Sequence, residues 1–448
     1  MSHDEIRAKA RSLMPGVVAD LSELVSHASV SFPAFPREPV LSCAQAVVDL
    51  LKRAGADNAR LLEIPGGYPA VYAEVAGPTG APTVLMYGHY DVQPAPLHAG
   101  WDTDPWTATL KADGRLYGRG AADNKSGVVI PAACLAVFDG APPVTVKIVI
   151  EGEEETMGHL EEFVEENPGL FACDVFIIAD MGNQRVGEPI VTTTLRGDVS
   201  CQVEVQTLEH PLHSGRFGGP TPDALMALIR MLDTLLDDDG NCAVPDAEAF
   251  DWPGVDMPEA QLRAGAAILP GVQLIGTGSV ASRLWSKPSV NVLAIDAPRV
   301  REAANILIPK ATAVLSMRIA PGANAETERE KLMAHLRSVV PWNAGVTITP
   351  FKALSAFTAP TGGPAHTAAL EAGAEAFGRA VGQAGSGGSI PLLNTLMKAV
   401  PGAEFVLWGA EDMSLSRIHS SNESVDLGEL ENCIVAQSLL MERLGASS

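Results

Sequence analysis

Apolar and polar positions follow two different spacings along this chain. In the first 55 residues, apolar side chains recur every three or four positions and predict two helices, one with Ile6, Val17 and Leu21 on one face and one over 39–54. From residue 70 onward, short apolar runs bounded by glycine or charged residues predict strands. Strands interleaved with helices indicate an α/β fold, in which helices cover a sheet.

Four of the apolar runs share one feature, because each is followed by side chains that bind metal ions or protons. They span 84–87, 144–150, 175–179 and 404–408, and they lead to His89 with Asp91, Glu154 with Glu155, Asp180, and His419. Asp123 comes from a glycine-rich turn over 118–127, at the start of a predicted helix. Ligands of open α/β sheets gather beyond the carboxyl ends of the strands. We therefore expect all of these side chains at one edge of the sheet.

His89 and Asp91 are two positions apart, so extended backbone places them on one face. A carboxylate that holds one nitrogen of an imidazole fixes its tautomer and makes the other nitrogen a better metal ligand. A hydrogen-bonded pair at a strand end, without any metal, is the alternative for these two residues alone. The acids at 151–155 likewise allow a solvated acidic loop, although acids directly after a buried strand are unfavourable without a positive partner.

A dinuclear metal site accounts for the whole set of residues. Asp123, Glu155 and Asp180 carry three negative charges and two divalent ions carry four positive ones, so that one bound hydroxide neutralises the remainder. Two histidines and three carboxylates, one of them bridging, suit a pair of zinc ions with open positions for water and substrate. Without cations, the same carboxylates repel one another.

Length and composition exclude several classes of protein for this chain. A chain of 448 residues exceeds one ordinary core and predicts two domains. The 31 basic and 54 acidic residues give a net charge of −23, which argues against nucleic acid or an anionic membrane as partner. Six cysteines without CxxC or CxxH spacing indicate neither a disulfide framework nor a thiolate zinc site. No apolar stretch reaches membrane-spanning length and the first residues are polar, so we expect a soluble cytoplasmic protein.

Three other kinds of enzyme are poorly supported. The stretch 118–127 begins like a dinucleotide-binding turn, but Asp123 takes its sixth position and no strand immediately precedes it. No nucleophile elbow occurs and no cysteine has an obvious histidine partner nearby, which argues against a serine or cysteine hydrolase. No cluster of Arg or Lys accompanies the metal-binding residues, as a dinuclear phosphoesterase would need.

Six short motifs carry a resemblance to a known family. They read GHYD at 88–91, GRGAADNK at 118–125, EGEEE at 151–155, LHSG at 212–215, GGSIP at 387–391 and HSSNE at 419–423. In this order, along nearly the whole chain, they resemble the motifs of the dizinc metallopeptidase family of aminoacylases, glutamate carboxypeptidase and carnosinase-type dipeptidases. The resemblance implies an α/β fold with a zinc-peptidase-like mixed sheet flanked by helices and an inserted α+β lid.

The resemblance also implies a role for each residue of the expected site. The two ligand sets are His89, Asp123 and Asp180 for one ion, and Asp123, Glu155 and His419 for the other. Asp91 orients the histidine of the first set, and Glu154 is the general base that accepts a proton from the attacking water. Zn²⁺ is the expected ion, with Mn²⁺ or Co²⁺ as alternatives.

The middle of the chain behaves as an inserted unit. Strand patterns over 199–205, 311–319 and 346–350, and helix patterns over 222–236 and 325–339, suggest a ferredoxin-like βαββαβ sandwich. We expect 1–196 and 353–448 to form the catalytic domain and 197–352 to form the insert. The resemblance makes this insert a lid and the contact surface of a homodimer.

Four residues acquire expected roles through the resemblance. His213 takes the place of a lid histidine that, in dimeric relatives, reaches the partner's active site and stabilises the tetrahedral oxyanion; a plain loop histidine is the alternative. Arg318 matches an arginine that grips a substrate carboxylate; an arginine that bridges lid residues is the alternative. Gly388 and Ser389, in the turn at 387–391, are expected to bind substrate.

Gly385 and Ser386 precede that turn where carnosinase-like relatives usually carry Arg and Glu. The missing charged pair leaves recognition of a free amino terminus open, and with it strict dipeptidase activity. We expect a metal-dependent hydrolase that cleaves the amide bond of dipeptides or related small peptides next to a carboxylate. An N-acyl-amino-acid deacylase with the same mechanism and a non-catalytic binding protein with the same fold are the alternatives.

Overall fold

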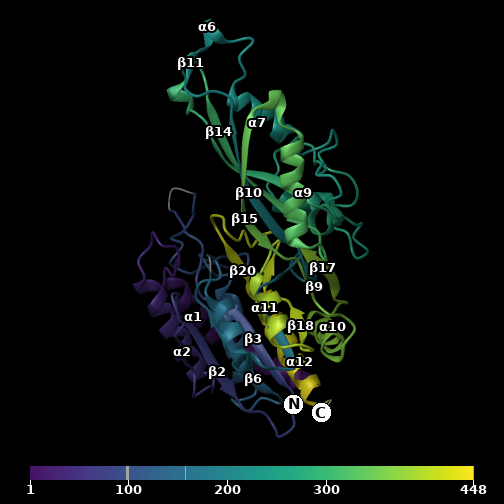
Figure 1. The fold of residues 1–448 in the computed structure, drawn as a ribbon. Coiled ribbons are helices and arrows are strands. Elements are labelled where there is room, and N and C mark those ends of the chain that lie inside the picture. The colour runs from purple at the N-terminus through teal and green to yellow at the C-terminus, as the bar shows by residue number, and fades with distance from the viewer. Residues whose placement is uncertain (97–99, 157, 447–448) are drawn as a thin grey trace.

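The computed structural model describes residues 1–96, 100–156 and 158–446. Two large sheets organise the chain, each with helices and a hydrophobic core of its own (Figure 1). The larger sheet lies in the part that contains both termini, here called the body. The smaller sheet lies in residues 197–354, here called the lid, which extends away from the body.

The sheet of the body is mixed. Its strands, in spatial order, are β1 (Arg60–Leu62), β2 (Ala70–Val75), β6 (Thr145–Glu151), β3 (Thr83–His89), β7 (Val175–Ile178), β18 (Glu404–Leu407), β9 (Ile190–Leu195) and β16 (Phe357–Thr358), and β17 (Gly382–Ser386) also pairs with β9. The central strands β6, β3, β7 and β18 are parallel, whereas β2 and β9 run antiparallel to their central neighbours. The four apolar runs of the sequence therefore lie side by side and end at the same edge.

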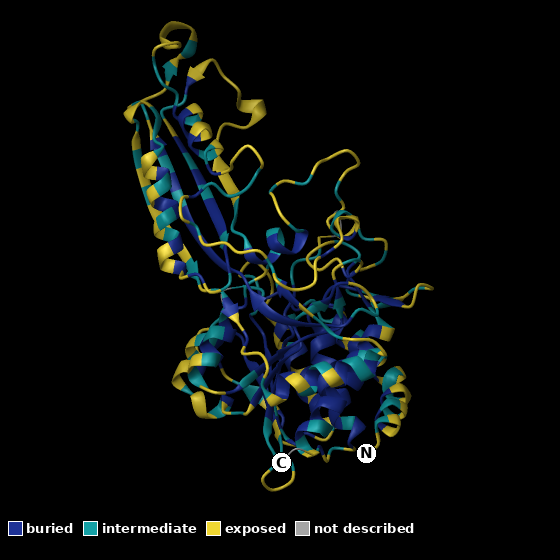
Figure 2. Cartoon of the chain, turned by 90° about the vertical axis from the view of Figure 1, so that its right-hand side faces the viewer, coloured by how far each residue is buried: buried dark blue, intermediate teal, exposed yellow. Residues whose placement is uncertain are grey.

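Helices cover both faces of this sheet. One face is covered by α1 (His3–Ser26), α2 (Glu38–Arg53), α3 (Lys125–Val137), α10 (Pro364–Phe377) and α12 (Leu427–Ala446), and the other by α4 (Leu160–Glu166), α5 (Pro168–Phe171) and α11 (Pro391–Ala399). The central strands are consequently buried on both sides, which explains their unbroken apolar runs (Figure 2). The two helices predicted in the first 55 residues are confirmed as α1 and α2.

The lid is built on a four-stranded antiparallel sheet. Its spatial order is β12 (Ser289–Asp296), β14 (Lys310–Ile319), β10 (Gly197–Gln206) and β15 (Gly345–Leu354). The helices α7 (Ala224–Asp233) and α9 (Ala325–Ser338) pack on the central strands and form a separate core with them. The sequence patterns did not locate β12, an edge strand whose side chains are mostly exposed.

The far end of the lid forms a small tip. There β11 (Leu212–His213) pairs with β13 (Ile306–Leu307), and α6 (Ser214–Phe217) contacts both. Both ribbon views place this tip away from the body (Figures 1 and 2).

Shorter elements join distant parts of the chain near the carboxyl edge of the body sheet. The strand β8 (Gly182–Asn183) pairs with β19 (Glu411–Asp412), and β5 (Arg115–Tyr117) lies between β4 (Thr109–Leu110) and β20 (Ser424–Asp426). Between α7 and β12 the main regular elements are α8 (Glu259–Gly265) and the single turn η2 (Ser282–Ser286). Within the three described ranges, no helix is long and apolar enough to cross a bilayer.

Phe405 in β18 tests the core of the body. Its side chain is 1% exposed, its ring stacks on Phe176 with 4.8 Å between ring centroids, and it meets Phe357 edge-on at 5.3 Å. We expect Phe405→Ala to lower the free energy of unfolding by about 3–5 kcal/mol, because the packed sheet cannot close the resulting cavity. Urea unfolding followed by circular dichroism measures the change. Phe351→Ala is the control, since that residue is 55% exposed, and an equal loss there would contradict the assignment.

Candidate metal centre

The candidate metal centre lies where the central strands of the body end. The strand β3 ends at His89, and Asp180 follows β7 after one intervening residue. The strand β6 leads into Glu154 and Glu155. His419 lies on the loop between β19 and β20, with a positive φ of 60°. The distances between these side chains show that they converge.

Two groups of ligand-type side chains share Asp123. One group is His89, Asp123 and Asp180, the other is Asp123, Glu155 and His419, and within each group the ligand atoms lie within 4.8 Å of one another. Nε2 of His89 lies 3.1 Å from Oδ1 of Asp123, whereas Nε2 of His419 lies 3.0 Å from Oδ2. The same nitrogens lie 3.4 Å from Asp180 and 3.3 Å from Glu155, respectively. One carboxylate thus turns one oxygen toward each group, as a ligand between two ions must.

The turn that carries Asp123 is held by Glu423, a residue to which the sequence analysis assigned no role. Oε1 of Glu423 accepts hydrogen bonds from the backbone N–H groups of Ala122 and Asp123, both at 3.0 Å. Its other oxygen accepts from Nη1 of Arg119, and both side chains are buried. The signal for this residue was its place at the end of the motif at 419–423. One side chain thereby ties the loop of His419 to the turn of Asp123.

Asn124 fixes the same turn against two strands. Its Oδ1 accepts a hydrogen bond from the backbone N–H of His89 at 3.2 Å, and its Nδ2 donates to the carbonyl of Ala179 at 2.7 Å. Gly127 makes this close approach possible, since a Cβ at this position would collide with Asn124 and with the Ala179 carbonyl. These hydrogen bonds set the position of the turn relative to the ends of β3 and β7.

Asp91 connects His89 to the loop of the two glutamates. Nδ1 of His89 lies 3.0 Å from the backbone carbonyl oxygen of Asp91 and 3.4 Å from its carboxylate. The carboxylate accepts hydrogen bonds from the backbone N–H groups of Glu154 and Glu155, both at 3.1 Å, and from Oγ of Ser31 at 2.7 Å. Asp91 thus contacts His89 most closely through its backbone, while its carboxylate positions the loop.

Glu154 stands beside both groups without belonging to either. Its Oε2 lies 3.9 Å from Nε2 of His89, and its side chain is 20% exposed. Burial, together with the carboxylates of Asp180 and Glu155, raises the pKa of Glu154 well above its usual value. A carboxyl group with a raised pKa is suited to accept a proton near neutral pH.

The balance of charge in the site requires cations. Burial and the nearby Asp123 carboxylate raise the pKa of Asp180 to about 6, and hydrogen bonds to Asp123 and Glu155 raise the pKa of His419 to about 10. Without other cations, protonated imidazoles supply the positive charge that the acids favour. Oε1 of Glu155 is buried and has no hydrogen-bond partner, so it remains available as a ligand atom. Imidazole nitrogens and carboxylate oxygens at these separations fit divalent ions such as Zn²⁺.

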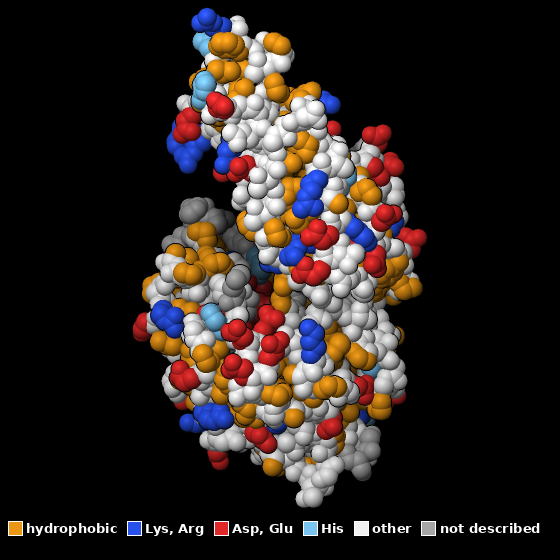
Figure 3. Space-filling view, viewed as in Figure 1, with side chains coloured by type: hydrophobic (Ala, Val, Ile, Leu, Met, Phe, Trp, Pro, Cys, Tyr) orange, Lys and Arg blue, Asp and Glu red, His pale blue; other side chains and the backbone are white. Residues whose placement is uncertain are grey.

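A cavity of about 320 Å³ opens onto both groups. Its wall includes Glu154, Trp285, Glu411 and the turn at 387–389. In the space-filling view, the surface is hollowed between the lid and the body, and Asp and Glu side chains gather on the body below this hollow (Figure 3). The volume suits a small ligand rather than a long peptide.

Gly388 and Ser389 line this cavity, and Arg318 reaches them from the lid. Nη1 of Arg318 donates to Oγ of Ser389 at 3.0 Å, and this hydroxyl donates to the backbone carbonyl of Arg196. The hydroxyl of Ser389 thus positions a guanidinium beside the cavity. Among the residues that the structure describes, no carboxylate forms an ion pair with Arg318, so its other N–H groups can bind an anion.

His213 is the predicted site residue that the structure does not bring to the centre. It lies in β11 at the tip of the lid, it is exposed, and its Nδ1 accepts a hydrogen bond from the backbone N–H of Gly215 at 3.1 Å. Because the tip lies away from the body, His213 does not reach the site of its own chain in this arrangement (Figure 1).

Comparison with known proteins agrees with this geometry. The family model of peptidase family M20/M25/M40 matches residues 85–443. The cysteinylglycine-S-conjugate dipeptidase of Corynebacterium striatum is 36% identical over 430 residues, which cover 94% of this chain and 94% of the relative. The Beta-Ala-His dipeptidase of Homo sapiens is 30% identical over 352 residues, which cover 72% of this chain and 69% of the relative.

Solved structures share the fold over the full length. The crystal structure of human carnosine dipeptidase 1 matches with a TM-score of 0.82 at 25% identity and covers 99% of both chains. The dipeptidase Dug1p from Saccharomyces cerevisiae matches with a TM-score of 0.84 at 21% identity, over 100% of this chain and 99% of that one, which is a likeness of fold alone. The family match spans every side chain of the two ligand groups. This chain therefore belongs to peptidase family M20/M25/M40.

Proposed function

We propose that this chain is a metal-dependent dipeptidase, which hydrolyses the peptide bond of dipeptides or related small peptides. The observation that carries the proposal is the Asp123 carboxylate shared by two histidine-containing groups, with Glu154 beside them. Relatives that match most of the chain are named as dipeptidases, which favours dipeptides over N-acyl amino acids and argues against a non-catalytic binding protein. The small cavity agrees with short substrates.

Two divalent ions per chain are part of the proposal. His89, Asp123 and Asp180 would hold one, and Asp123, Glu155 and His419 would hold the other. Zn²⁺ fits this ligand set best, and Mn²⁺ or Co²⁺ would suit it as well. Such ions polarise a carbonyl oxygen and lower the pKa of bound water from about 15.7 to about 7. Their binding requires neutral imidazoles, so His89 and His419 lose their protons when the site is loaded.

Glu154 performs the proton transfers in this proposal. Its carboxylate accepts a proton from the water that attacks the scissile carbonyl carbon, and then donates it to the nitrogen of the leaving amino acid. Asp91 holds the backbone of Glu154 and Glu155, so that one glutamate serves as base and its neighbour as ligand. In this proposal, no covalent bond forms between the substrate and the protein.

Arg318, Gly388 and Ser389 would bind the carboxyl end of the substrate. The planar guanidinium of Arg318 can form two parallel hydrogen bonds to a carboxylate, and Ser389 holds it beside the cavity. Gly388 lines the same cavity without a side chain, which lets the backbone of a peptide lie against it. The scissile bond then lies between this carboxylate site and the two ligand groups.

A homodimer through the lid is proposed because His213 lies away from its own site. In such a dimer, the tip of one lid brings His213 to the cavity of the partner, where its imidazole stabilises the oxyanion. The edge strand β12 offers apolar contact area, since Val292, Leu293 and Ile295 are 46%, 63% and 44% exposed.

The same proposal covers domain division and location. The catalytic domain would comprise 1–196 and 355–448, and the lid and dimerisation domain 197–354, because β15 ends at Leu354, two residues beyond the boundary predicted from the sequence. Six free cysteines favour a reducing compartment such as the cytoplasm.

Metal content tests the shared carboxylate. We expect elemental analysis of zinc-supplemented protein to find two ions per chain, as two separate ligand groups imply. Asp123→Ala should lose both ions, because Asp123 belongs to both groups, whereas His419→Ala should keep the ion of the His89 group. A chelator should lower the Tm of the wild type and leave that of Asp123→Ala unchanged, since only a bound ion stabilises the folded state. Equal metal content in the two variants would argue against bridging.

Glu154→Gln tests the base and the proposed function together. We expect this variant to keep its metal ions and to lose about 10²–10⁴-fold in kcat for dipeptides, because a glutamine cannot accept the proton. Mass spectrometry of the products from a panel of dipeptides and N-acyl amino acids measures the rates. Glu153→Gln is the control, since Oε2 of Glu153 forms a hydrogen bond with Nδ1 of His159 at 2.9 Å and Glu153 belongs to neither ligand group. Equal rates for Glu154→Gln and the wild type would refute the base, and wild-type cleavage of N-acyl amino acids alone would refute the function.

Mixed dimers test the proposed role of His213. We expect His213→Ala and Glu154→Gln each to be nearly inactive as homodimers. After random exchange of equal amounts, half of the dimers are mixed and each has one site with both residues intact, so about a quarter of the wild-type activity should return. Exchange of His213→Ala with the doubly substituted chain is the control and should restore nothing. Absence of recovery in a sample with proven subunit exchange would rule out a shared site.

A further inference from the structure

One carboxylate in the cavity has no role in the proposed chemistry. Glu411 lines the cavity together with the ligand-type residues but belongs to neither group. The strand β19 places it there, because Glu411 pairs with Gly182, two residues beyond Asp180. In the described part of the chain, its carboxylate has no hydrogen-bond or ion-pair partner. A ligand with a positive group would supply that partner.

Another part of the same wall, at 385–389, carries no charge. Gly385 has no room for a side chain, since a Cβ there would lie 2.7 Å from Cβ of Trp285 and 2.9 Å from Oγ1 of Thr194. Oγ of Ser386 accepts a hydrogen bond from the backbone N–H of Gly388 at 3.2 Å. Position 385 is therefore closed to an arginine, position 386 carries a hydroxyl instead of a carboxylate, and no side chain of this stretch can neutralise an ammonium group.

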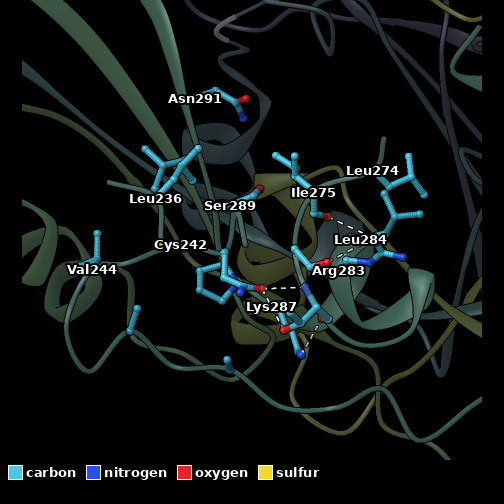
Figure 4. A pocket seen from close by; sticks show the side chains of 18 of the residues that line it. Leu236, Cys242, Val244, Leu274, Ile275, Arg283, Leu284, Lys287, Ser289 and Asn291 are labelled. Carbon is cyan, nitrogen blue, oxygen red and sulfur yellow. Dashed lines mark hydrogen bonds between the residues drawn. The ribbon is translucent and has the colours of Figure 1, made fainter. Parts of the chain in front are cut away.

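Trp285 is held firmly in this position. It is 2% exposed, and its ring meets the ring of Trp252 edge-on with 5.3 Å between centroids. On the far side of η2, Arg283 and Lys287 donate to backbone carbonyls of the preceding loop at 3.1 and 3.0 Å (Figure 4). These side chains line a second cavity, of about 480 Å³, and fix both ends of the turn. Trp285 is thus a rigid part of the wall and leaves position 385 closed to larger residues.

A dipeptide brings its own cation to the site. Its α-ammonium group is attached to the carbon next to the scissile carbonyl, so it lies close to the two ligand groups when that carbonyl does. Of the carboxylates in the cavity, Asp123, Glu155 and Asp180 are proposed ligands and Glu154 is the proposed base. We propose that Glu411 binds the α-ammonium group of the substrate and so selects peptides with a free amino terminus. This inference rests on the proposed dipeptidase function and names the residue that recognises one end of its substrate.

Selectivity follows from the negative charge of Glu411. An ammonium group forms a charge-assisted hydrogen bond to Glu411, which is stronger than a bond between neutral groups. An N-acyl substrate would instead place a neutral amide beside this partly buried carboxylate and leave its charge without a cationic partner, which is unfavourable. With Arg318 for the carboxylate and Glu411 for the ammonium group, both charged groups of a dipeptide would have a partner.

The test compares alanyl-glycine with N-acetyl-alanyl-glycine in the metal-loaded enzyme. We expect Glu411→Gln to lower kcat/KM for alanyl-glycine by about 10–100-fold, mainly through KM, because a hydrogen bond to a charged group is lost. The slow cleavage of the acetylated peptide should stay unchanged, and so should the metal content. Glu411→Asp keeps the charge and should recover part of the loss.

Two outcomes would overturn the inference. Equal losses on both peptides, or a loss of metal, would mean that Glu411 supports the metal centre rather than the ammonium group. Wild-type rates on both peptides would mean that Glu411 does not contact the ammonium group. Failure of the proposed function has a different signature, because the wild type would then release no amino acid from alanyl-glycine, and both proposals would fall.

Discussion

Repulsion among the acids that end neighbouring strands is the constraint on which this structure depends. Two unit charges 4 Å apart interact by about 4 kcal/mol at an effective dielectric constant of 20, so unshielded carboxylates at this spacing would force the edge of the sheet apart. Histidine nitrogens at 3.0–3.4 Å from Asp123, Glu155 and Asp180 supply part of the compensating charge. Glu423 and Asp91 contribute in another way, because they hold the backbone of the turn and the loop that carry these acids.

Much of the body and of the site could be predicted because the signals are local. Each central strand is an apolar run. A ligand-type residue or Glu154 follows each run within a few positions or after one loop, so the parallel pairing of the strands brings these residues together. The hydrogen bonds that hold the backbone of the site could not be predicted in this way. The bond between Asp91 and the backbone of Glu154 spans 63 residues, and the bond between Glu423 and the backbone of Asp123 spans 300. The edge strand β12 was not located from the sequence: it carries apolar residues such as Val292 and Ile295, but they are exposed and do not alternate with buried positions.

The lid carries predicted site residues at both of its ends. At its base, Arg318 of β14 contacts Ser389 in the wall of the cavity. At its tip, His213 lies away from the body of its own chain. A four-stranded sheet connects the two ends, and a sheet does not bend as a short loop would, so both residues cannot approach one cavity of the same chain without a large rearrangement. The proposed dimer removes this conflict, because the base of each lid serves its own chain and the tip serves the partner.

The wall of the cavity shows that a residue able to bind the amino end of a substrate can lie outside the sequence motif that lines the same cavity. The stretch 385–391 has no charged side chain: Trp285 occupies the volume that a side chain at Gly385 would need, and Ser386 carries only a hydroxyl. A reading of this stretch alone suggests that the amino end of a substrate is not recognised. The folded chain nevertheless brings Glu411 to the same cavity, and the pairing of β19 with β8 ties this residue to the strand end that carries Asp180. For the proposed selectivity, the distance between the Glu411 carboxylate and the scissile bond matters, and the backbone pairing of β19 with β8, next to Asp180, fixes the position of Glu411 more firmly than a glycine-rich turn would.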